Sequence, residues 1–333
     1  MDWHTYLASQ GAHTDEQGQV SFPTAAADTA LVPLQQFGLI RFSGEETLAF
    51  LHGQVSSDLK KMPADGCQYS SYSTPKGRML ASFLVLREAD DILLMLPRAL
   101  QAGVQKRLSM YVLRSKTRAS DASDERVLLG LNGPQATAIA LAVFGSAPAE
   151  AMQTIKLAGG LLARLGQDRL LLCLTLDAAM AAWPALLAAG AQPSGTAAWT
   201  LSDIRAGIPW ILPETQEAFV AQMANMELIG AVSFKKGCYP GQEIVARTQY
   251  LGKLKRRTFR VSATAPMQAG QAVYSPEMNG QASGQVALAA PAGEGLWEAL
   301  VVVQMASVEH GVHLDSPEGP LLTFLPLPYP VHE

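Results

Sequence analysis

The sequence predicts an α+β fold that is followed by an all-β domain at the C-terminus. Between residues 30 and 250, stretches with the helical spacing of apolar residues alternate with short strand-like runs. After Gly252 the pattern changes to short strands separated by glycine and proline turns, which is typical of a small β-barrel. Hydrophobic residues make up 48% of the 333 residues and charged residues 16%, so we expect a large buried core and exclude a disordered chain.

A chain of this length is expected to form two or three packed units. We predict an N-terminal extension, an α+β region made of two subdomains, and a β-barrel domain. Their expected bounds are 1–30 for the extension, 31–250 for the α+β region (subdomains 31–125 and 126–250) and 251–333 for the barrel. The net charge of −4 gives no global attraction to nucleic acid or anionic membranes, so any anion site must be local.

The first subdomain begins with a predicted strand at 39–42. Ser43-Gly-Glu-Glu46 has the spacing of a capping box, before a helix that places Leu48, Leu51 and Val55 on one face. Further elements are predicted as strands at 68–74, 79–86 and 92–96, a helix from Pro97, and a closing strand at 126–131. Strand–helix–strand–strand–helix–strand is the order of a split βαβ, ferredoxin-like unit.

The second subdomain and the barrel follow in the same way. A helix is predicted at 135–144, a hairpin of strands 161–165 and 170–174 turns at Gly166-Gln-Asp168, and further helices begin at Ala178 and Thr196. The barrel strands are predicted near 258–261, 285–288, 296–303 and 321–324.

The cysteines and the apolar stretches indicate the compartment. Cys67, Cys173 and Cys238 are odd in number, far apart and without a CxxC pair, which favours a reducing compartment. They are also too few to supply the usual ligands of an iron–sulfur cluster. The N-terminus lacks the apolar run of a signal peptide, and the most apolar stretch, 178–191, contains Pro184 and is too short to span a bilayer. We therefore expect a cytoplasmic protein that does not associate with a membrane.

The stretch from Phe234 to Arg247 carries the clearest chemical signal, a cysteine between two turns. Gly237 is expected to take a positive φ just before Cys238, and Pro240-Gly241 predicts a second bend before a helix over 242–250. A thiol on such a turn is expected to face solvent, and the two preceding lysines favour a reactive thiol. The alternative is a small residue that only fills a tight turn.

A basic cluster follows this stretch. Its members are Arg247, Lys253, Lys255, Arg256, Arg257 and Arg260, and no acidic residue occurs from Ile244 to Met267. The cluster is either a solvated strand face or an anion site for a folate polyglutamate tail or an RNA backbone. The six histidines show no metal-ligand spacing with carboxylates or cysteines, so no metal site is expected.

The segment Lys236-Gly-Cys-Tyr-Pro-Gly-Gln-Glu243 resembles the KGCYxGQE signature of the YgfZ proteins, folate-binding relatives of the glycine-cleavage T-protein, an aminomethyltransferase. The resemblance extends over nearly the whole chain. It includes Phe50–Asp58, Pro75–Arg78, Asp124–Gly130, Ala206–Pro209 and Leu325–Tyr329. It implies a T-protein-like fold, with ferredoxin-like units around a central cavity that accepts tetrahydrofolate or another reduced folate.

The resemblance also implies folate contacts, with two departures. Phe37 stands where the family carries a tryptophan, which leaves a weaker stacking platform, and Trp199 matches the second aromatic position, although a tryptophan on a helix is otherwise a core residue. Arg205 replaces the glutamate of T-proteins and can only donate hydrogen bonds, so it pairs either with a folate carboxylate or, as we favour, with an internal acid. The remaining candidate contacts are Lys236, Tyr239, Glu243 and Arg247.

A third comparison concerns catalysis. T-protein-like enzymes carry an acidic pair on the strand after the glycine-rich turn, but alignment from Gly77 puts Ala81 and Ser82 there. Neither residue can act as a general base, so we do not expect aminomethyltransferase activity. Whether any other reaction is catalysed stays open.

The leading hypothesis is a tetrahydrofolate-binding accessory protein that supports assembly or repair of iron–sulfur enzymes, including tRNA-modifying ones, with Cys238 as the functional thiol. Its expected partners are a reduced folate and iron–sulfur client enzymes or assembly proteins. The alternative is a folate-dependent one-carbon transferase or demethylase, for which Glu243 is the nearest candidate base. Direct RNA binding through the strip from Lys253 to Arg260 is a third possibility.

Overall fold

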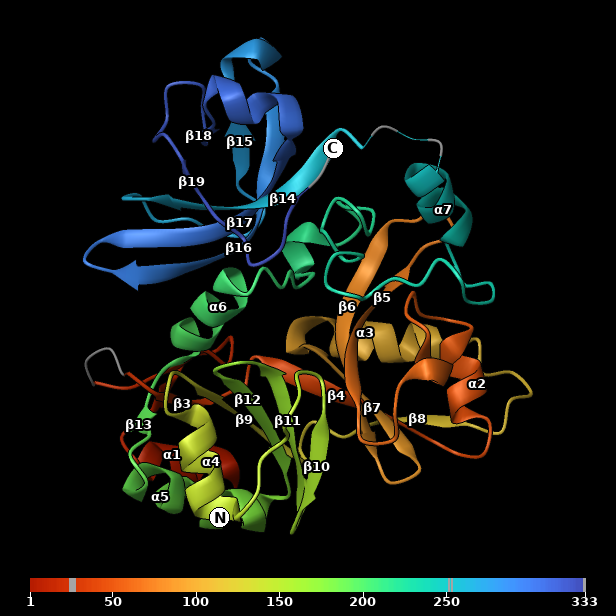
Figure 1. The fold of residues 1–333 in the computed structure, drawn as a ribbon, viewed down its shortest axis with the longest axis vertical. Coiled ribbons are helices and arrows are strands. Elements are labelled where there is room, and N and C mark those ends of the chain that lie inside the picture. The colour runs from red at the N-terminus through yellow and green to blue at the C-terminus, as the bar shows by residue number, and fades with distance from the viewer. Residues whose placement is uncertain (24–27, 251, 253, 332–333) are drawn as a thin grey trace. The chain divides into compact units, whose positions relative to one another are not determined.

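The structure is a computed structural model that describes all residues except 24–27, 251, 253 and 332–333 (Figure 1). The chain forms two compact units, each built from three separate stretches. Unit 1 comprises Met1–Leu48, Lys61–Gln68 and Leu84–Trp199, and unit 2 comprises Ala49–Lys60, Tyr69–Phe83 and Thr200–Glu333.

A six-stranded sheet in the order β10-β11-β12-β9-β3-β13 organises one half of unit 1. Its strands are β3 (Ala30–Pro33), β9 (Val127–Asn132), β10 (Thr154–Leu157), β11 (Gly160–Gly166), β12 (Arg169–Leu174) and β13 (Gln192–Pro193). All neighbours are antiparallel except β13, which runs parallel to β3. The hairpin predicted around Gly166 is confirmed as β11–β12. Every residue of β12 is buried, as expected for a leucine-rich central strand.

Three helices pack on this sheet: α1 (Trp3–Ser9), α4 (Ala136–Phe144) and α5 (Leu176–Ala188). A short hairpin of β1 (His13–Thr14) and β2 (Val20–Ser21) follows α1. The indole of Trp183 on α5 is fully buried, and the ring of Trp3 lies edge-on to it at 5.9 Å between centroids. Helix α1, in the predicted N-terminal extension, therefore packs against the core of unit 1.

A second, five-stranded sheet has the order β5-β6-β7-β4-β8. Its strands are β4 (Phe37–Ser43), β5 (Cys67–Ser73), β6 (Met79–Glu88), β7 (Asp91–Pro97) and β8 (Arg118–Asp121). Helix α3 (Arg98–Ser109) packs on β4, β7 and β8, with Leu100, Val104 and Leu108 buried. The boundary between the units falls inside β6, after Phe83.

The prediction that residues 126–131 close this sheet is wrong. That stretch forms β9 in the six-stranded sheet, and the unpredicted β8 occupies the edge of the five-stranded one. The reason is polarity: Val127–Leu131 is apolar and buried, which suits a central strand, whereas β8 is polar and half-exposed and has no apolar pattern.

The predicted capping box is also absent. Helix α2 spans Thr47–His52, so Val55 lies beyond its end. The Glu46 carboxylate accepts a hydrogen bond from the backbone N–H of Lys116 at 2.5 Å instead of capping α2. The spacing of residues 43–46 could not predict this hydrogen bond, because its donor, Lys116, is distant in the sequence.

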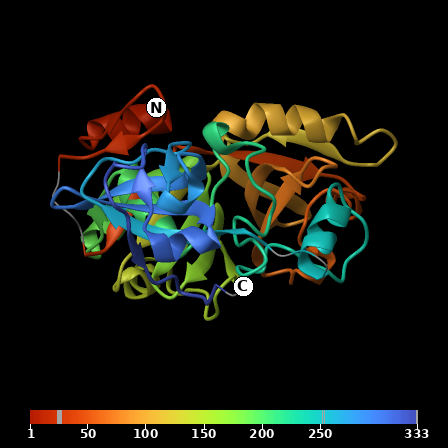
Figure 2. The same ribbon diagram turned by 90° about the horizontal axis from the view of Figure 1, so that it is seen from above.

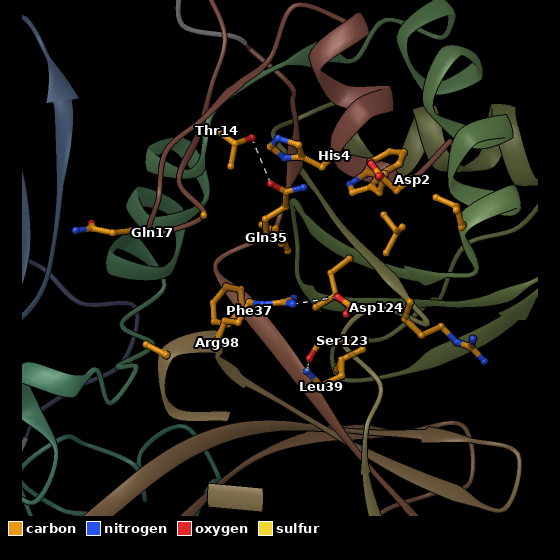
Figure 3. Close-up of a pocket in the computed structure, with 18 of the residues that line it drawn as sticks. Asp2, His4, Thr14, Gln17, Gln35, Phe37, Leu39, Arg98, Ser123 and Asp124 are labelled. Carbon is orange, nitrogen blue, oxygen red and sulfur yellow. Dashed lines mark hydrogen bonds and ion pairs between the residues drawn. The ribbon is translucent and has the colours of Figure 1, made fainter. Parts of the chain in front are cut away.

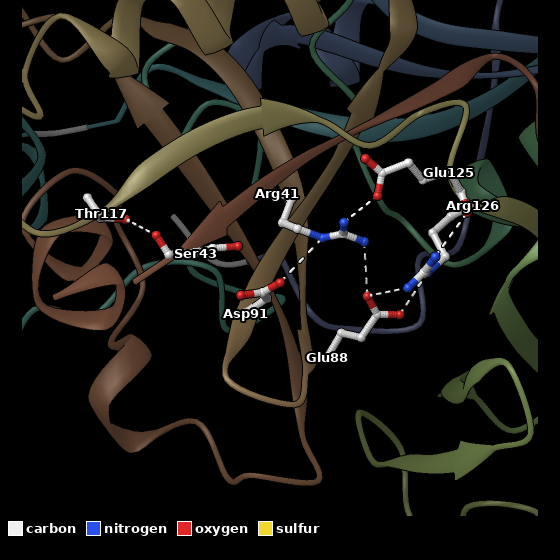
Figure 4. Close-up of polar contacts among 7 residues, drawn as sticks. All are labelled: Arg41, Ser43, Glu88, Asp91, Thr117, Glu125 and Arg126. Carbon is white, nitrogen blue, oxygen red and sulfur yellow. Dashed lines mark hydrogen bonds and ion pairs between the residues drawn. The ribbon is translucent and has the colours of Figure 1, made fainter. Parts of the chain in front are cut away.

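An ion network crosses the five-stranded sheet where β4, β6 and β7 meet the segment after β8 (Figure 4). Arg41 on β4 binds Glu88 at 3.2 Å and Asp91 at 3.4 Å, and it also pairs with Glu125. Arg126 donates two hydrogen bonds to the same Glu88 carboxylate, at 2.8 and 2.9 Å. Glu88 is thus satisfied from two sides, which fixes its position at the edge of the core.

The C-terminal part of unit 2 is a curled antiparallel sheet in the order β18-β15-β16-β17-β14-β19, a half-barrel. Its strands are β14 (Arg256–Ala263), β15 (Ala272–Tyr274), β16 (Ala282–Gly293), β17 (Leu296–Gln304), β18 (His313–Leu314) and β19 (Thr323–Leu325). Valines of β14, β16 and β17 form its core. The four predicted strands of this domain are confirmed.

Unit 2 also contains α7 (Gln242–Tyr250), and α6 (Thr196–Arg205) begins in unit 1 and continues into unit 2. Short 3₁₀ helices lie at Leu59–Lys61, Pro213–Thr215, Pro276–Met278 and Met305–His310. Among the described residues, no helix is both long enough and apolar enough to cross a membrane.

Candidate functional site

The loop before α7 presents the cysteine that the sequence singled out. Cys238 is exposed, whereas Cys67 and Cys173 are buried. Burial raises the pKa of each of these two buried thiols to about 12, so they stay protonated at neutral pH. The predicted exposure of Cys238 is confirmed, and it is the accessible thiol among the three.

Lys236 fixes this loop to the segment after α2. Its amine donates a hydrogen bond to the carbonyl oxygen of Val55 at 2.5 Å and another to that of His52. The side chain is 8% exposed. Burial lowers the pKa of Lys236 to about 8, with the Asp58 carboxylate opposing the shift and Lys60 adding to it. The amine therefore faces backbone carbonyls and serves as an anchor.

Tyr239 completes the anchor on the other side of the cysteine. Its ring is 7% exposed and lies with its centroid 4.9 Å from the Lys236 amine, a cation–π contact. Burial raises the pKa of the Tyr239 phenol to about 12. Cys238 thus projects between two buried neighbours, so its position in the loop is restrained on both sides.

Two glycines bring the backbone of this loop against the turn between β5 and β6. Gly241 has a φ of 82° and Gly77 a φ of 73°. A Cβ on Gly241 would lie 2.6 Å from the carbonyl oxygen of Thr74 and 2.8 Å from Cα of Gly77, closer than van der Waals contact. Only glycine permits this approach, which sets the start of α7.

The expected positive φ at Gly237 is wrong. Gly237 does not have a positive φ, and a Cβ there would meet no atom within 4 Å. The turn at Pro240-Gly241 is confirmed, since the N–H of Gln242 donates to the carbonyl of Tyr239 at 3.1 Å. In this loop the left-handed backbone conformation therefore occurs at Gly241, three residues after Cys238.

Glu243 and Arg247 lie on α7, which confirms the predicted helix. Both side chains are exposed. Glu243 is in the first turn, where a carboxylate favours the positive end of the helix dipole. Their candidate role as folate contacts stays a prediction.

Trp199 lies in the first half of α6 and is 1% exposed. Its ring lies against β9 at Gly130, where a Cβ would lie 2.2 Å from the indole. The guanidinium of Arg169 on β12 sits 4.9 Å from the centre of the same ring. Within unit 1, Trp199 is a packing residue against the six-stranded sheet.

Arg205 ends the same helix and pairs with an internal acid, as favoured from the sequence. It donates to Glu298 on β17 at 2.8 Å, and Arg260 on β14 donates to the same carboxylate at 2.9 Å. The Glu298 side chain is only 5% exposed. Burial raises the pKa of Glu298, but hydrogen bonds from the two arginines outweigh it and lower the pKa overall.

Two residues of the basic cluster, Arg257 and Arg260, are paired inside the protein, whereas Arg247 and Lys255 are exposed. Arg257 donates to the carbonyl oxygen of Gln222 at 3.0 Å and pairs with Glu227, whose side chain is 9% exposed. Arg260 is bound to Glu298, and Lys253 lies outside the described residues. Two members of the proposed anion strip therefore have structural partners.

Ala81 and Ser82 lie within β6 and are buried. The hydroxyl oxygen of Ser82 accepts the backbone N–H of Ile211 at 2.9 Å. The hydroxyl thus holds the segment after α6 to the strand, and the aligned position offers no carboxylate.

Phe37 lines a cavity in unit 1 of about 750 Å³ (Figure 3). Its walls come from the N-terminal segment, β4, the start of α3 and the segment before β9, and Trp199 is not among its lining residues. Asp124, whose carboxylate accepts from Arg98 at 3.0 Å, lies opposite Phe37, and Gln35 and Thr14 face the interior. The sequence did not predict this lining, because the N-terminal segment carries no motif and reaches the cavity only through packing.

No group of three or more histidine, cysteine or acidic side chains is arranged to hold a metal ion in the part of the chain that the structure describes. His313 uses its Nδ1 atom in a 2.8 Å contact with the Gly319 carbonyl.

The chain is similar to a known protein family and to several known proteins. The GCVT N-terminal domain family matches residues 21–236. A tRNA-modifying protein YgfZ from Sodalis glossinidius is 29% identical over 321 residues, covering 95% of this chain and 97% of the relative. Proteins of the same description from Colwellia psychrerythraea and Escherichia coli O7:K1 are 31% and 30% identical over 70% and 73% of this chain, and 71% and 75% of their own lengths.

Among solved structures, the glycine cleavage system aminomethyltransferase T from Bartonella henselae is similar with a TM-score of 0.79. The similarity covers 97% of this chain and 95% of the other at 19% identity. At that identity the likeness establishes the fold alone, which is the T-protein-like fold expected from the sequence.

Proposed function

Since the chain belongs to the YgfZ family, with a GCVT N-terminal domain, we propose that it is a cytoplasmic accessory protein that binds tetrahydrofolate or another reduced folate and uses the Cys238 thiol. Its role is to support the assembly or repair of iron–sulfur enzymes, including enzymes that modify tRNA. The printed description of its relatives as tRNA-modifying proteins supports the last part of this proposal.

The observation that carries the proposal is the presentation of Cys238. The thiol is exposed, while Lys236 and Tyr239 on either side of it are buried and in contact with each other. An accessible thiol on a restrained loop can contact a partner's metal or disulfide without a loss of loop entropy on binding. With one such thiol, the chain fits a transient ligand or redox group better than a scaffold that holds a whole cluster.

The folate part is supported by the cavity that Phe37 lines. Its volume of about 750 Å³ falls within the roughly 300–1,000 Å³ of small-molecule sites. The lining includes the aromatic ring of Phe37, which suits the flat face of a pterin, and the exposed carboxylate of Asp124, which is already paired with Arg98. When bound, a reduced folate supplies one-carbon and reducing chemistry.

Two observations count against a T-protein-type reaction. Ala81 and Ser82 provide no carboxylate on β6, and the Ser82 hydroxyl already accepts a backbone hydrogen bond. Glu243, the candidate base of a one-carbon transferase, is exposed in the first turn of α7. An exposed carboxylate there is explained by the helix dipole, so the accessory role is favoured.

The thiol role is tested with Cys238→Ser in cells that lack the native protein. The variant should lower the activity of iron–sulfur enzymes and the tRNA modifications that depend on them, while the fold is retained. Gly237→Ala is the matched control, since its neighbourhood is open, and it should support normal activity. Normal enzyme activities with Cys238→Ser would remove the thiol from the proposal.

Folate binding is tested by fluorescence titration of the purified protein with tetrahydrofolate. Phe37→Ala should weaken binding if the ligand occupies the cavity of unit 1, and Trp199→Ala should weaken it if that indole is the contact. No saturable signal with the wild-type protein would contradict the folate assignment.

A further inference from the structure

We propose that the segment from Lys106 to Arg118 is a docking surface for single-stranded RNA. The segment, here called the α3–β8 arm, comprises the last turn of α3, the following loop and the first residue of β8. Figure 2 shows this loop, in gold, at the free end of α3. The proposal does not depend on Cys238 or on a folate.

The charge of the arm is opposite to that of the whole chain. The chain carries a net charge of −4, yet no acidic residue occurs between Asp91 and Asp121. The cations in this interval are Arg98, Lys106, Arg107, Arg114, Lys116 and Arg118. Because the surrounding charge is balanced or negative, this positive potential is local, as a phosphate-binding site requires.

The cations of the arm are accessible. Lys106, Arg114 and Arg118 are exposed, and in the described residues none of them forms an ion pair. Lys116 pairs with Glu45 at 3.1 Å, but both side chains are more than 70% exposed, so the pair is weak and exchangeable. This differs from the strip at 247–260, where Arg257 and Arg260 are held by buried carboxylates.

Apolar side chains are interleaved with these cations. Tyr111 is 48% exposed, Met110 60% and Leu113 88%. Helix α3 has already placed its core residues at Leu100, Val104 and Leu108, so the later apolar residues are not needed for packing. An exposed aromatic ring among arginines and lysines matches the way single-stranded nucleic acids are bound, with bases stacked on rings and phosphates on cations.

The mixture of residues favours a single-stranded nucleic acid over a protein partner or a duplex. Protein interfaces are depleted in lysine at their centres, whereas this arm has two lysines beside its apolar residues. A duplex keeps its bases stacked internally, so Tyr111 can contribute only to an unpaired strand. The arm is therefore expected to bind single-stranded RNA more tightly than a duplex of the same sequence.

The test is fluorescence anisotropy of the full chain with a fluorescein-labelled single-stranded RNA of mixed sequence, over a range of salt concentrations. The charge variant is Lys106→Gln, Arg114→Gln and Arg118→Gln combined. With about 0.7 released counterions per phosphate contact, it should lower the slope of log K against log salt by about 2 and the affinity in 0.1 M salt by about a hundredfold. Tyr111→Ala should lower the affinity by about tenfold without changing that slope, and Tyr111→Phe should bind like the wild type.

A second triple variant, Lys60→Gln with Lys76→Gln and Lys156→Gln, is the matched control. It removes the same charge from exposed positions outside the arm and should bind RNA like the wild type. An equal loss in this control, or no RNA binding by the wild type, would overturn the proposal. Binding of the wild type to phosphatidylglycerol vesicles but not to RNA would also overturn it and make the arm a membrane-surface element.

Discussion

Substitution of Gly241 by alanine tests whether the close approach of two backbones positions the cysteine loop. Gly241 has a φ of 82°, and the position that a Cβ would occupy lies against Thr74 and Gly77 in the turn between β5 and β6. An alanine there must hold a left-handed conformation and place a methyl group where backbone atoms already lie. Neither problem can be relieved by a side-chain rotation.

The expected loss of stability follows from these two effects. A left-handed conformation costs alanine about 1–2 kcal/mol. The methyl group would lie 2.6 Å from the Thr74 oxygen and 2.8 Å from Cα of Gly77, and overpacking of this kind costs about 1–3 kcal/mol. The lower entropy of the unfolded alanine chain returns about 0.4–1 kcal/mol. We expect a net loss of about 2–4 kcal/mol, a large part of the roughly 5–15 kcal/mol of a typical domain.

The assay is urea unfolding combined with hydrogen exchange of peptides that cover the two segments. A loss of 2 kcal/mol should raise exchange rates in 69–83 and 239–250 by about 25-fold, since each 1.4 kcal/mol is a factor of ten. Gly237→Ala, in the same loop but with open space around it, should change stability by less than about 0.5 kcal/mol. Equal effects of the two substitutions would refute the role assigned to the Gly77–Gly241 contact.

Three further predictions concern titratable groups. Iodoacetamide should label Cys238 in the folded protein and reach Cys67 and Cys173 only after unfolding, which mass spectrometry of labelled peptides measures; labelling of all three under native conditions would contradict the burial. Because burial lowers the pKa of Lys236 to about 8, the unfolded chain binds more protons between that pH and about 10.4, so the free energy of unfolding should rise with pH there. Lys236→Met should flatten this rise in urea titrations, and an unchanged slope would disprove the assignment. Hydrogen bonds lower the pKa of Glu298, so the stability that this carboxylate contributes should be present at neutral pH and lost as the pH falls through that pKa. Glu298→Gln should therefore lower the free energy of unfolding by about 2 kcal/mol at pH 7 and leave it unchanged in acid. An equal loss at both pH values would show that Glu298 contributes through packing alone.

The helices and strands that were predicted correctly are those set by residues close together in the sequence. The leucine-rich hairpin of β11 and β12, the helix after the Pro240-Gly241 turn and the strands of the half-barrel follow from periodicity and turn residues. Strand β8 was missed, and β9 was assigned to the wrong sheet, because pairing between strands is set by burial on both faces. Periodicity within one segment does not contain that information.

The features of the candidate site also separate into those that residue chemistry predicted and those that depend on distant contacts. The exposure of Cys238 and the internal pairing of Arg205 follow from residue chemistry and were predicted. The contacts of Lys236 with carbonyls near α2 were not, because they join residues more than 180 positions apart. The positive φ was expected at Gly237 but occurs at Gly241, since its cause is the neighbouring turn at Gly77.

The division of each unit into three stretches constrains how the chain can be synthesised and cut. Unit 2 contains residues 49–60 and 69–83 as well as the entire C-terminal third, so those early segments leave the ribosome long before their packing partners exist. A fragment that stops before residue 200 leaves the segments 49–60 and 69–83 without the rest of their core. A fragment that begins at residue 200 lacks His52 and Val55, whose carbonyl oxygens accept hydrogen bonds from Lys236. The cysteine loop therefore takes its final form only after residues 52–77 and the loop itself have both been synthesised.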